Sequence, residues 1–161
     1  MLKKLLLVAV LFAALVSCKS KGAYNYSQDI VAKERSLTPD IEATESKVTK
    51  FVTDGTYDSI VVAAEKMEKM VQVKIDEIDA MKVPKAKEVD NFKAATLRYF
   101  RYIKSIYTTY KELGKATTEE GRQAVVENLQ KLVDEKTAVI TEMQKAQRSY
   151  AEANGFKVEK L

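Results

Sequence analysis

Apolar residues recur at alternating steps of three and four residues through most of this 161-residue chain, and this spacing constrains the fold more than any other feature of the sequence. It places apolar side chains along one face of an α-helix, whereas a half-buried strand needs strict alternation. Glycine and proline, which interrupt helices, number only five and two. Spacing and composition together predict an all-α protein.

The spacing occupies four long segments, and each ends at residues that stop helices. Glycines follow the first, third and fourth segments at positions 55, 114 and 155, and Pro84 follows the second. Glycine adopts the left-handed conformation that ends many helices, and the residue before proline resists the helical conformation. The expected helices cover about residues 24–52, 57–81, 85–113 and 118–153.

Short connections between four amphipathic helices favour antiparallel packing of neighbours. We therefore predict an up-down-up-down four-helix bundle over residues 24–154, followed by a tail at 155–161. Glu34 and Lys136 fall on the apolar seam itself. Lys74 lies on the seam and Glu68 at its edge, and we expect the charged ends of both side chains to reach water.

Local signals at the helix starts refine this expectation. Thr56 is placed to cap the second helix, and Thr117 and Glu120 have the spacing of a capping box before the fourth. Pro39, inside the first segment, leaves two interpretations open. Either a new helix begins there with Thr38 as its N-cap, or one helix continues with a kink. We favour the kink, because the apolar stripe stays in phase across the proline.

The chain contains no histidine, and this absence excludes several kinds of site. Catalytic triads that use imidazole, Glu-x-x-His di-iron sites and zinc sites of the Cys/His type cannot be built. Glu119 and Glu120 are adjacent, so their carboxylates face different directions and do not flank a substrate. The methionines and tyrosines mostly occupy core positions, which makes haem ligation unexpected. We predict no enzymatic activity, no cofactor and no metal.

Residues 97–104 interleave basic and aromatic side chains, as nucleic-acid and glycan platforms do. On a helix, Tyr99, Phe100 and Ile103 face the core. The side chains expected to point away from it are Arg98, Arg101, Tyr102 and Lys104. We interpret the stretch as core plus solvated rim. The alternative is a surface patch, formed by the second group, that contacts an anionic glycan or lipid.

The amino terminus has the pattern of an export signal. Lys3 and Lys4 precede an apolar run of eleven residues that ends at Leu15. The run is too short for a membrane span, which takes about 20 residues, but it suits a removable secretory signal. The sequence Leu-Val-Ser-Cys at 15–18 resembles the lipobox of bacterial lipoproteins. This resemblance implies that residues 1–17 are removed, that Cys18 receives a diacylglyceryl group and that the new amino terminus is acylated.

Cysteine usage supports the lipobox interpretation. Cys18 is the only cysteine of the chain, so no intrachain disulfide is available, and an exported free thiol would meet an oxidising compartment. Lipidation removes that difficulty, and several acyl chains anchor a protein stably. The alternative is an ordinary signal peptide with an incidental cysteine. In the favoured interpretation, residues 18–23 form a lipidated linker between the membrane and the bundle.

The residue after Cys18 bears on localisation in the bacterial cell envelope. Among bacterial lipoproteins, a residue other than aspartate at this position implies release to the outer membrane, and here the residue is Lys19. The pattern leaves open whether the protein faces the periplasm or the cell surface. Removing Lys3 and Lys4 from the 27 basic residues leaves 25 against 23 acidic ones, a formal charge of +2. This balance gives no reason to expect a nucleic-acid partner.

The segment 146–156, together with Tyr24-Asn25 and residues 29–31, resembles the ends of small all-helical bacterial surface lipoproteins of unknown function. The resemblance implies a lipid-anchored bundle in which Tyr150 packs near Tyr24 and Asn25, and it transfers no site residues. The leading hypothesis is a non-catalytic binding or scaffolding module held to a membrane through Cys18. Its partner would be an envelope protein or an anionic glycan or lipid. Alternatives are a carrier of a small hydrophobic ligand or lipid, which needs an interior cavity of several hundred Å³, and partner inhibition through one helix face.

Overall fold

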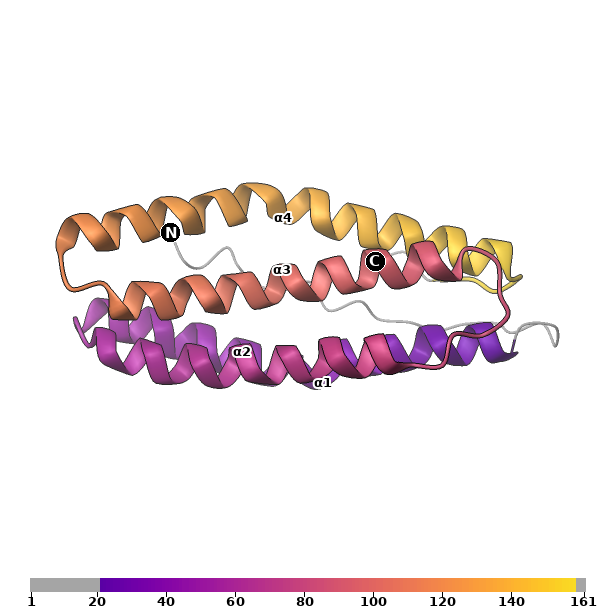
Figure 1. Ribbon diagram of the computed structural model, residues 1–161, viewed down its shortest axis with the longest axis horizontal. Helices are drawn as coiled ribbons and strands as arrows, with labels where there is room; N and C mark the ends of the chain where they lie inside the picture. Colours follow the sequence, from indigo (N-terminus) through magenta and orange to yellow (C-terminus); the bar gives the residue numbers. More distant parts are fainter. Residues whose placement is uncertain (1–20, 159–161) are drawn as a thin grey trace.

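The computed structural model describes residues 21–158, of which 86% are helical and none forms a sheet. The described helices are α1 (Lys21–Thr53), α2 (Tyr57–Ala80), α3 (Val89–Lys115) and α4 (Glu119–Ala153). They run alternately up and down one elongated rod (Figure 1), which confirms the predicted four-helix bundle. The expected signal peptide, lipobox and anchor at Cys18 lie outside the described residues.

The two ends of the rod differ in what they carry. One end, here called the terminal end, holds the start of α1, the loop 81–88 and the last turn of α4. The opposite end, here called the turn end, holds the connections 54–56 and 116–118. Within residues 21–158, no helix combines the length and apolarity of a membrane span.

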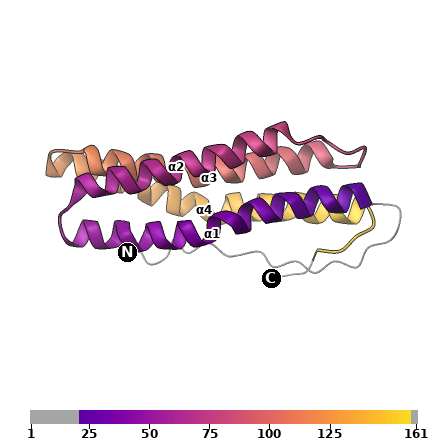
Figure 2. The ribbon, with the colours of Figure 1, turned by 90° about the horizontal axis from the view of Figure 1, so that it is seen from below.

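Pro39 lies within α1, so the first helix is continuous, as the favoured interpretation predicted. Figure 2 shows α1 changing direction part-way along. Proline removes one backbone donor and crowds the preceding turn, which bends a helix without ending it when the flanking stripe is buried. Leu37 and Ile41, on either side of the proline, are both buried and hold the two halves against one core.

The expected start of the third helix at Lys85 is wrong, because α3 begins at Val89. The side chain of Asn154, at the end of α4, donates to the carbonyl oxygen of Lys87 at 2.9 Å and accepts from its amide at 3.2 Å. The backbone of Lys87 is therefore bonded across 67 residues instead of within a helical turn. Glu88 then adopts a left-handed conformation, with φ of 58°, before α3 starts.

Three further terminal signals can be compared with the structure. The positive φ of Gly55 and Gly155 and the 3.0 Å bond from the Phe156 amide to the Ala151 carbonyl confirm the expected helix stops. The N-cap of α4 is Thr118 rather than Thr117, and its hydroxyl accepts from the amide of Gly121 at 3.1 Å. Thr56 precedes α2 but makes no side-chain capping bond.

Gly114 does not end its helix as expected, since α3 continues to Lys115. A Cβ atom at Gly114 would lie 2.6 Å from Cγ2 of Val61 and 2.7 Å from the carbonyl oxygen of Tyr57. The glycine is therefore required by the close approach of α2 and α3, not by a left-handed turn.

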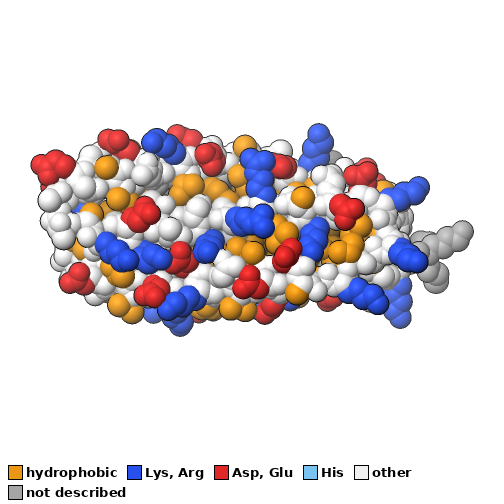
Figure 3. Space-filling model, viewed as in Figure 1, with side chains coloured by type: hydrophobic (Ala, Val, Ile, Leu, Met, Phe, Trp, Pro, Cys, Tyr) orange, Lys and Arg blue, Asp and Glu red, His pale blue; other side chains and the backbone are white. Residues whose placement is uncertain are grey.

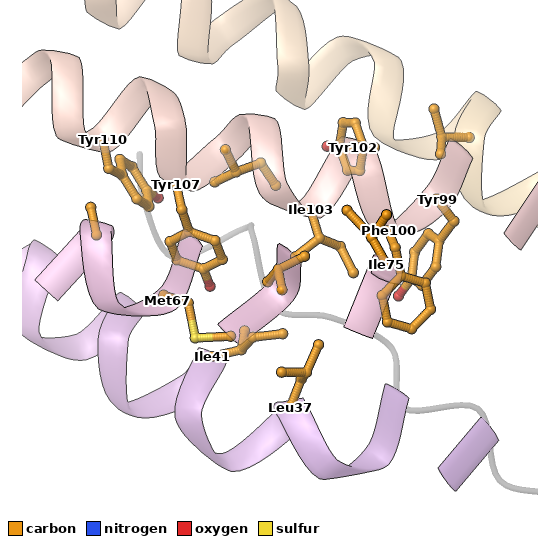
Figure 4. Close-up of a cluster of buried hydrophobic side chains, with 14 of the residues drawn as sticks. Leu37, Ile41, Met67, Ile75, Tyr99, Phe100, Tyr102, Ile103, Tyr107 and Tyr110 are labelled. Carbon is orange, nitrogen blue, oxygen red and sulfur yellow. The ribbon is translucent and has the colours of Figure 1, made fainter. Parts of the chain in front are cut away.

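The main core fills the interior along most of the rod. Side chains of α1, α2 and α3 converge there, among them Leu37, Met67, Phe100 and Ile103 (Figure 4). At the terminal end a second cluster surrounds Tyr150, whose ring stacks on Phe92 at 4.9 Å. The Tyr150 hydroxyl donates to the carbonyl of Ala23 at 3.1 Å, so Tyr150 does pack at the start of the first helix.

Candidate binding cleft at the turn end

α1 and α4 meet at the terminal end and diverge toward the turn end, as Figures 1 and 2 together show. A cleft of about 160 Å³ lies at the turn end beside α4. Residues from all four helices line it: Val52, Tyr57, Tyr110, Leu113, Glu119, Arg122, Gln123, Val126, Leu129, Gln130 and Val133.

The walls of the cleft are mainly apolar. Val126, Leu129 and Val133 follow one another at steps of three and four residues on α4 and face the cleft. Val126 remains 45% exposed, although it belongs to the apolar stripe of its helix. The stripe of α4 is therefore incompletely covered where α1 turns away, and the cleft is the result.

Arg122 forms the polar rim. Its guanidinium lies 4.6 Å from the ring centroid of Tyr57. The same group donates from Nε to a Glu119 carboxylate oxygen at 3.1 Å and from Nη1 to the Ala116 carbonyl at 2.9 Å. Three contacts from one side chain fix the Arg122 guanidinium and tie the start of α4 to α2. A shallower, more polar hollow beside Gly55 shares Tyr57 and Arg122 as its border.

A carboxylate lies close to the cleft. The hydroxyl of Tyr110, a lining residue, donates to Oε2 of Glu45 on α1 at 2.8 Å. Burial raises the pKa of Glu45, and the hydrogen bonds from Tyr110 and Tyr107 and the charge of Lys136 oppose that rise. Burial lowers the pKa of Lys136, and the Glu45 charge opposes this effect. Helices α1, α3 and α4 thus contribute polar groups to one partly buried cluster.

A second carboxylate and tyrosine pair repeats this arrangement three helical turns away. Tyr99 donates to Oε1 of Glu34 at 2.8 Å, and in both pairs the partners are 65 residues apart. The constant separation shows that α1 and α3, which run in the same direction, keep one register along the bundle. Burial raises the pKa of Glu34, against the lowering effects of Tyr99 and Arg35.

The Glu34 pair predicts how stability varies with pH. The folded-state pKa lies above the ordinary value of 4.5, so the native state holds the proton more tightly than the unfolded state. The stability that protonated Glu34 contributes is therefore complete below the ordinary pKa of 4.5, and it is lost as pH rises through the higher folded-state pKa. Glu34→Gln removes this ionisation and keeps an oxygen acceptor for Tyr99. The variant should gain stability relative to the parent as pH rises from about 4 to about 7.

Urea unfolding followed by circular dichroism across that pH range measures this difference. Glu42→Gln, at an exposed position on the same helix, is the matched control and should show no such trend. A constant difference between Glu34→Gln and the parent at every pH would contradict the assigned direction of the Glu34 pKa.

The basic and aromatic side chains of the alternative surface-patch interpretation do not share one surface. Arg98 pairs with Glu142 of α4 at 2.8 Å, and the Lys104 ammonium donates to Gln72 of α2 at 2.7 Å. The expectation that Tyr102 points away from the core is wrong. Tyr102 is buried, and its hydroxyl donates to the Leu132 carbonyl of α4 at 2.7 Å. Arg101 is exposed, and its role in binding stays a prediction.

The positions of Lys74 and Glu68 on or beside the apolar seam had predicted that the charged ends of both side chains would reach water. Glu68 is mostly covered, and its carboxylate bonds to Thr108 at 2.6 Å and to Lys111. Lys74 pairs with Glu77 at 3.3 Å on the surface between α1 and α2. Within residues 21–158 no three potential metal ligands of the His, Cys, Asp or Glu type lie close enough to hold an ion.

The cleft and the two carboxylate–tyrosine pairs are the features of interest that sequence reasoning missed. A signal for the pairs was present, since Glu34 and Glu45 are separated by the same eleven residues as Tyr99 and Tyr110. Comparisons with family models, curated proteins and solved structures find no match. The functional argument therefore depends on this chain alone.

Proposed function

We propose that this protein is a lipid-tethered, non-catalytic helical binding module of the bacterial envelope, held by Cys18 and binding its partner at the turn-end cleft. The observation that carries the proposal is the placement of the two sites. α1 begins at Lys21, three residues after Cys18, and the cleft lies at the other end of the bundle. A helix of 33 residues separates them by about 50 Å.

This separation suits a tethered binding module. A lipid at Cys18 would hold the terminal end at a bilayer and leave the turn end facing the surrounding compartment. The cleft would then be accessible to a protein or glycan that is not itself in the membrane. The acyl chains would not reach the cleft, because the short linker ends at the opposite end of the rod.

Cys18→Ser tests the tether. With Cys18 intact, the protein should incorporate radiolabelled fatty acid and fractionate with membranes. The variant should lose the label, because no thiol remains to carry the diacylglyceryl group. Processing without lipid in the parent protein, or an unmodified thiol in its mass spectrum, would refute the tether and leave an ordinary exported bundle.

A carrier of a small hydrophobic ligand is the second candidate, favoured by the apolar lining of the cleft. The volume of about 160 Å³ is close to that of a cavity that accepts one benzene ring, and it is smaller than typical lipid or cofactor sites. The cleft therefore suits a single ring or a short branched chain. Such a group could belong to a free ligand or to a side chain of a bound protein.

Val126→Trp tests occupancy of the cleft. The indole should fill the space beside Leu129 and abolish the chemical-shift changes that single-ring aromatic compounds induce in the cleft residues of the parent. Val62→Trp is the matched control, because Val62 is 72% exposed on α2 and does not line the cleft. If the ring compounds induce no shifts in the parent protein, the carrier hypothesis fails.

A further inference from the structure

Five exposed lysines gather at the terminal end, and they come from three separate parts of the chain. They are Lys21, Lys82, Lys85, Lys87 and Lys157. Figure 3 shows basic side chains grouped at this end, on the right of the view. Over residues 21–24, 81–88 and 150–158 these five meet two exposed acidic residues, Glu88 and Glu152.

The turn end has the opposite balance. The two connections together with the helix residues that flank them, 54–58 and 115–120, hold four acidic side chains and one basic one. The rod is therefore polarised along its length, with the positive end beside the start of α1. This asymmetry is hidden in the overall charge, because acidic and basic residues nearly cancel over the whole chain.

The five lysines are also uncommitted. Among residues 21–158, none of the ion pairs includes a lysine of this group, although the pair between Lys93 and Asp79 lies next to the terminal end. Elsewhere Lys33, Lys74 and Lys111 are each paired with glutamate. The ammonium groups of these exposed lysines are therefore available to a partner outside the chain.

The loop and the C-terminal segment that carry four of the lysines are held in place by contacts with the rest of the bundle. The two hydrogen bonds between Asn154 and the backbone of Lys87 fasten the loop to α4. Ala86 from the loop and Val158 from the C-terminal segment pack against the aromatic cluster around Tyr150. Val83, which is 38% exposed, adds an apolar side chain among the lysines.

We propose that this lysine-rich terminal end docks on anionic lipid headgroups and holds the rod upright on the bilayer. The inference rests on the proposed tether, because a lipid at Cys18 would hold this end at the headgroup layer. Each lysine near an anionic surface strengthens binding by roughly fivefold. Docking through the end of the rod keeps the turn-end cleft about 50 Å from the membrane.

The first experiment measures binding of unlipidated protein to vesicles, so that docking is tested without the tether. Residues 18–161 with Cys18→Ser contain the whole bundle. This protein should sediment with vesicles containing phosphatidylglycerol at low salt and not with pure phosphatidylcholine vesicles. Replacing Lys82, Lys85 and Lys87 together by alanine should weaken binding on the order of 100-fold.

A control variant removes the same charge from elsewhere on the rod. Lys47, Lys115 and Lys131 are exposed and lie away from the terminal end, and their joint replacement by alanine should leave vesicle binding nearly unchanged. Equal loss in both triple variants would overturn the proposal, because it would show attraction by net charge alone. Binding to an anionic polysaccharide with none to vesicles would also overturn it, in favour of a glycan partner.

The second experiment measures orientation. Removing Cys18 leaves no cysteine, so single cysteines can carry an environment-sensitive dye. Dye at Ala153→Cys, near the terminal end, should shift its emission on phosphatidylglycerol vesicles, whereas dye at Thr117→Cys, at the turn end, should not. A shift at both positions would show a rod lying flat and refute upright docking. Failure of the Cys18 lipidation test leaves both of these measurements unaffected, so the two proposals fail separately.

Discussion

Replacing Tyr150 by alanine should lower the free energy of unfolding by about 3–5 kcal/mol. The side chain is fully buried. The centroid of its ring lies 4.9 Å from that of Phe92, 5.8 Å from that of Phe156 and 6.2 Å from that of Tyr26. Removing it leaves a cavity at the place where α1 and α4 meet. Urea unfolding followed by circular dichroism measures the loss.

Two variants separate the contributions of Tyr150. Tyr150→Phe keeps the ring and loses only the hydrogen bond to the Ala23 carbonyl, so it should cost about 1 kcal/mol. Tyr24→Ala removes an aromatic ring that is only partly buried and packs on Phe156 at the edge of the same cluster. If Tyr150→Ala cost no more than Tyr24→Ala, the cluster would not be what joins α1 to α4.

Gly114→Ala should destabilise the bundle by about 1–3 kcal/mol, although alanine favours helices more than glycine does. The new methyl group would lie 2.7 Å from the Tyr57 carbonyl oxygen and 2.9 Å from the Val61 amide nitrogen. Both are backbone atoms of α2, so the two helices must separate to admit the methyl group. Gly114→Val should cost more, because valine adds two further methyl groups at the same crossing.

Gly22→Ala is the matched control for this prediction. Gly22 also lies in a helix, but the nearest atom to an added Cβ, in the side chain of Pro84, is 4.0 Å away. The substitution should be neutral or stabilise by up to about 1 kcal/mol. Thermal unfolding of both variants provides the comparison, and a stabilised Gly114→Ala would show that α2 and α3 are not in such close contact.

The helices themselves could be predicted because their determinants are local. Apolar spacing, Gly55, Gly155 and the Val83-Pro84 stop act within one or two turns, and the structure has helix ends close to most of the expected positions. The start of α3 was missed because the backbone of Lys87 bonds to a side chain 67 residues away. A local signal contains no information about such a partner.

Site predictions were less successful for a related reason. Helical periodicity assigns a side chain to a face, but it does not say how widely the neighbouring helix covers that face. Tyr102 was expected in solvent, yet α4 lies over it and supplies a backbone acceptor. Gly114 has the look of a helix stop in the sequence, and only the crossing with α2 reveals its role.

The sequence by itself determined that this chain forms four amphipathic helices, where three of them stop, and that imidazole chemistry is absent. Tertiary structure decided which groups meet: Glu34 with Tyr99, Glu45 with Tyr110, and the lysines of three segments at one end. It also decided that α1 and α4 diverge and leave a cleft. The physical reason is the sequence distance over which each interaction acts. Hydrogen bonds within a helix join residues four apart, whereas the register and divergence of neighbouring helices depend on packing between residues far apart in the chain.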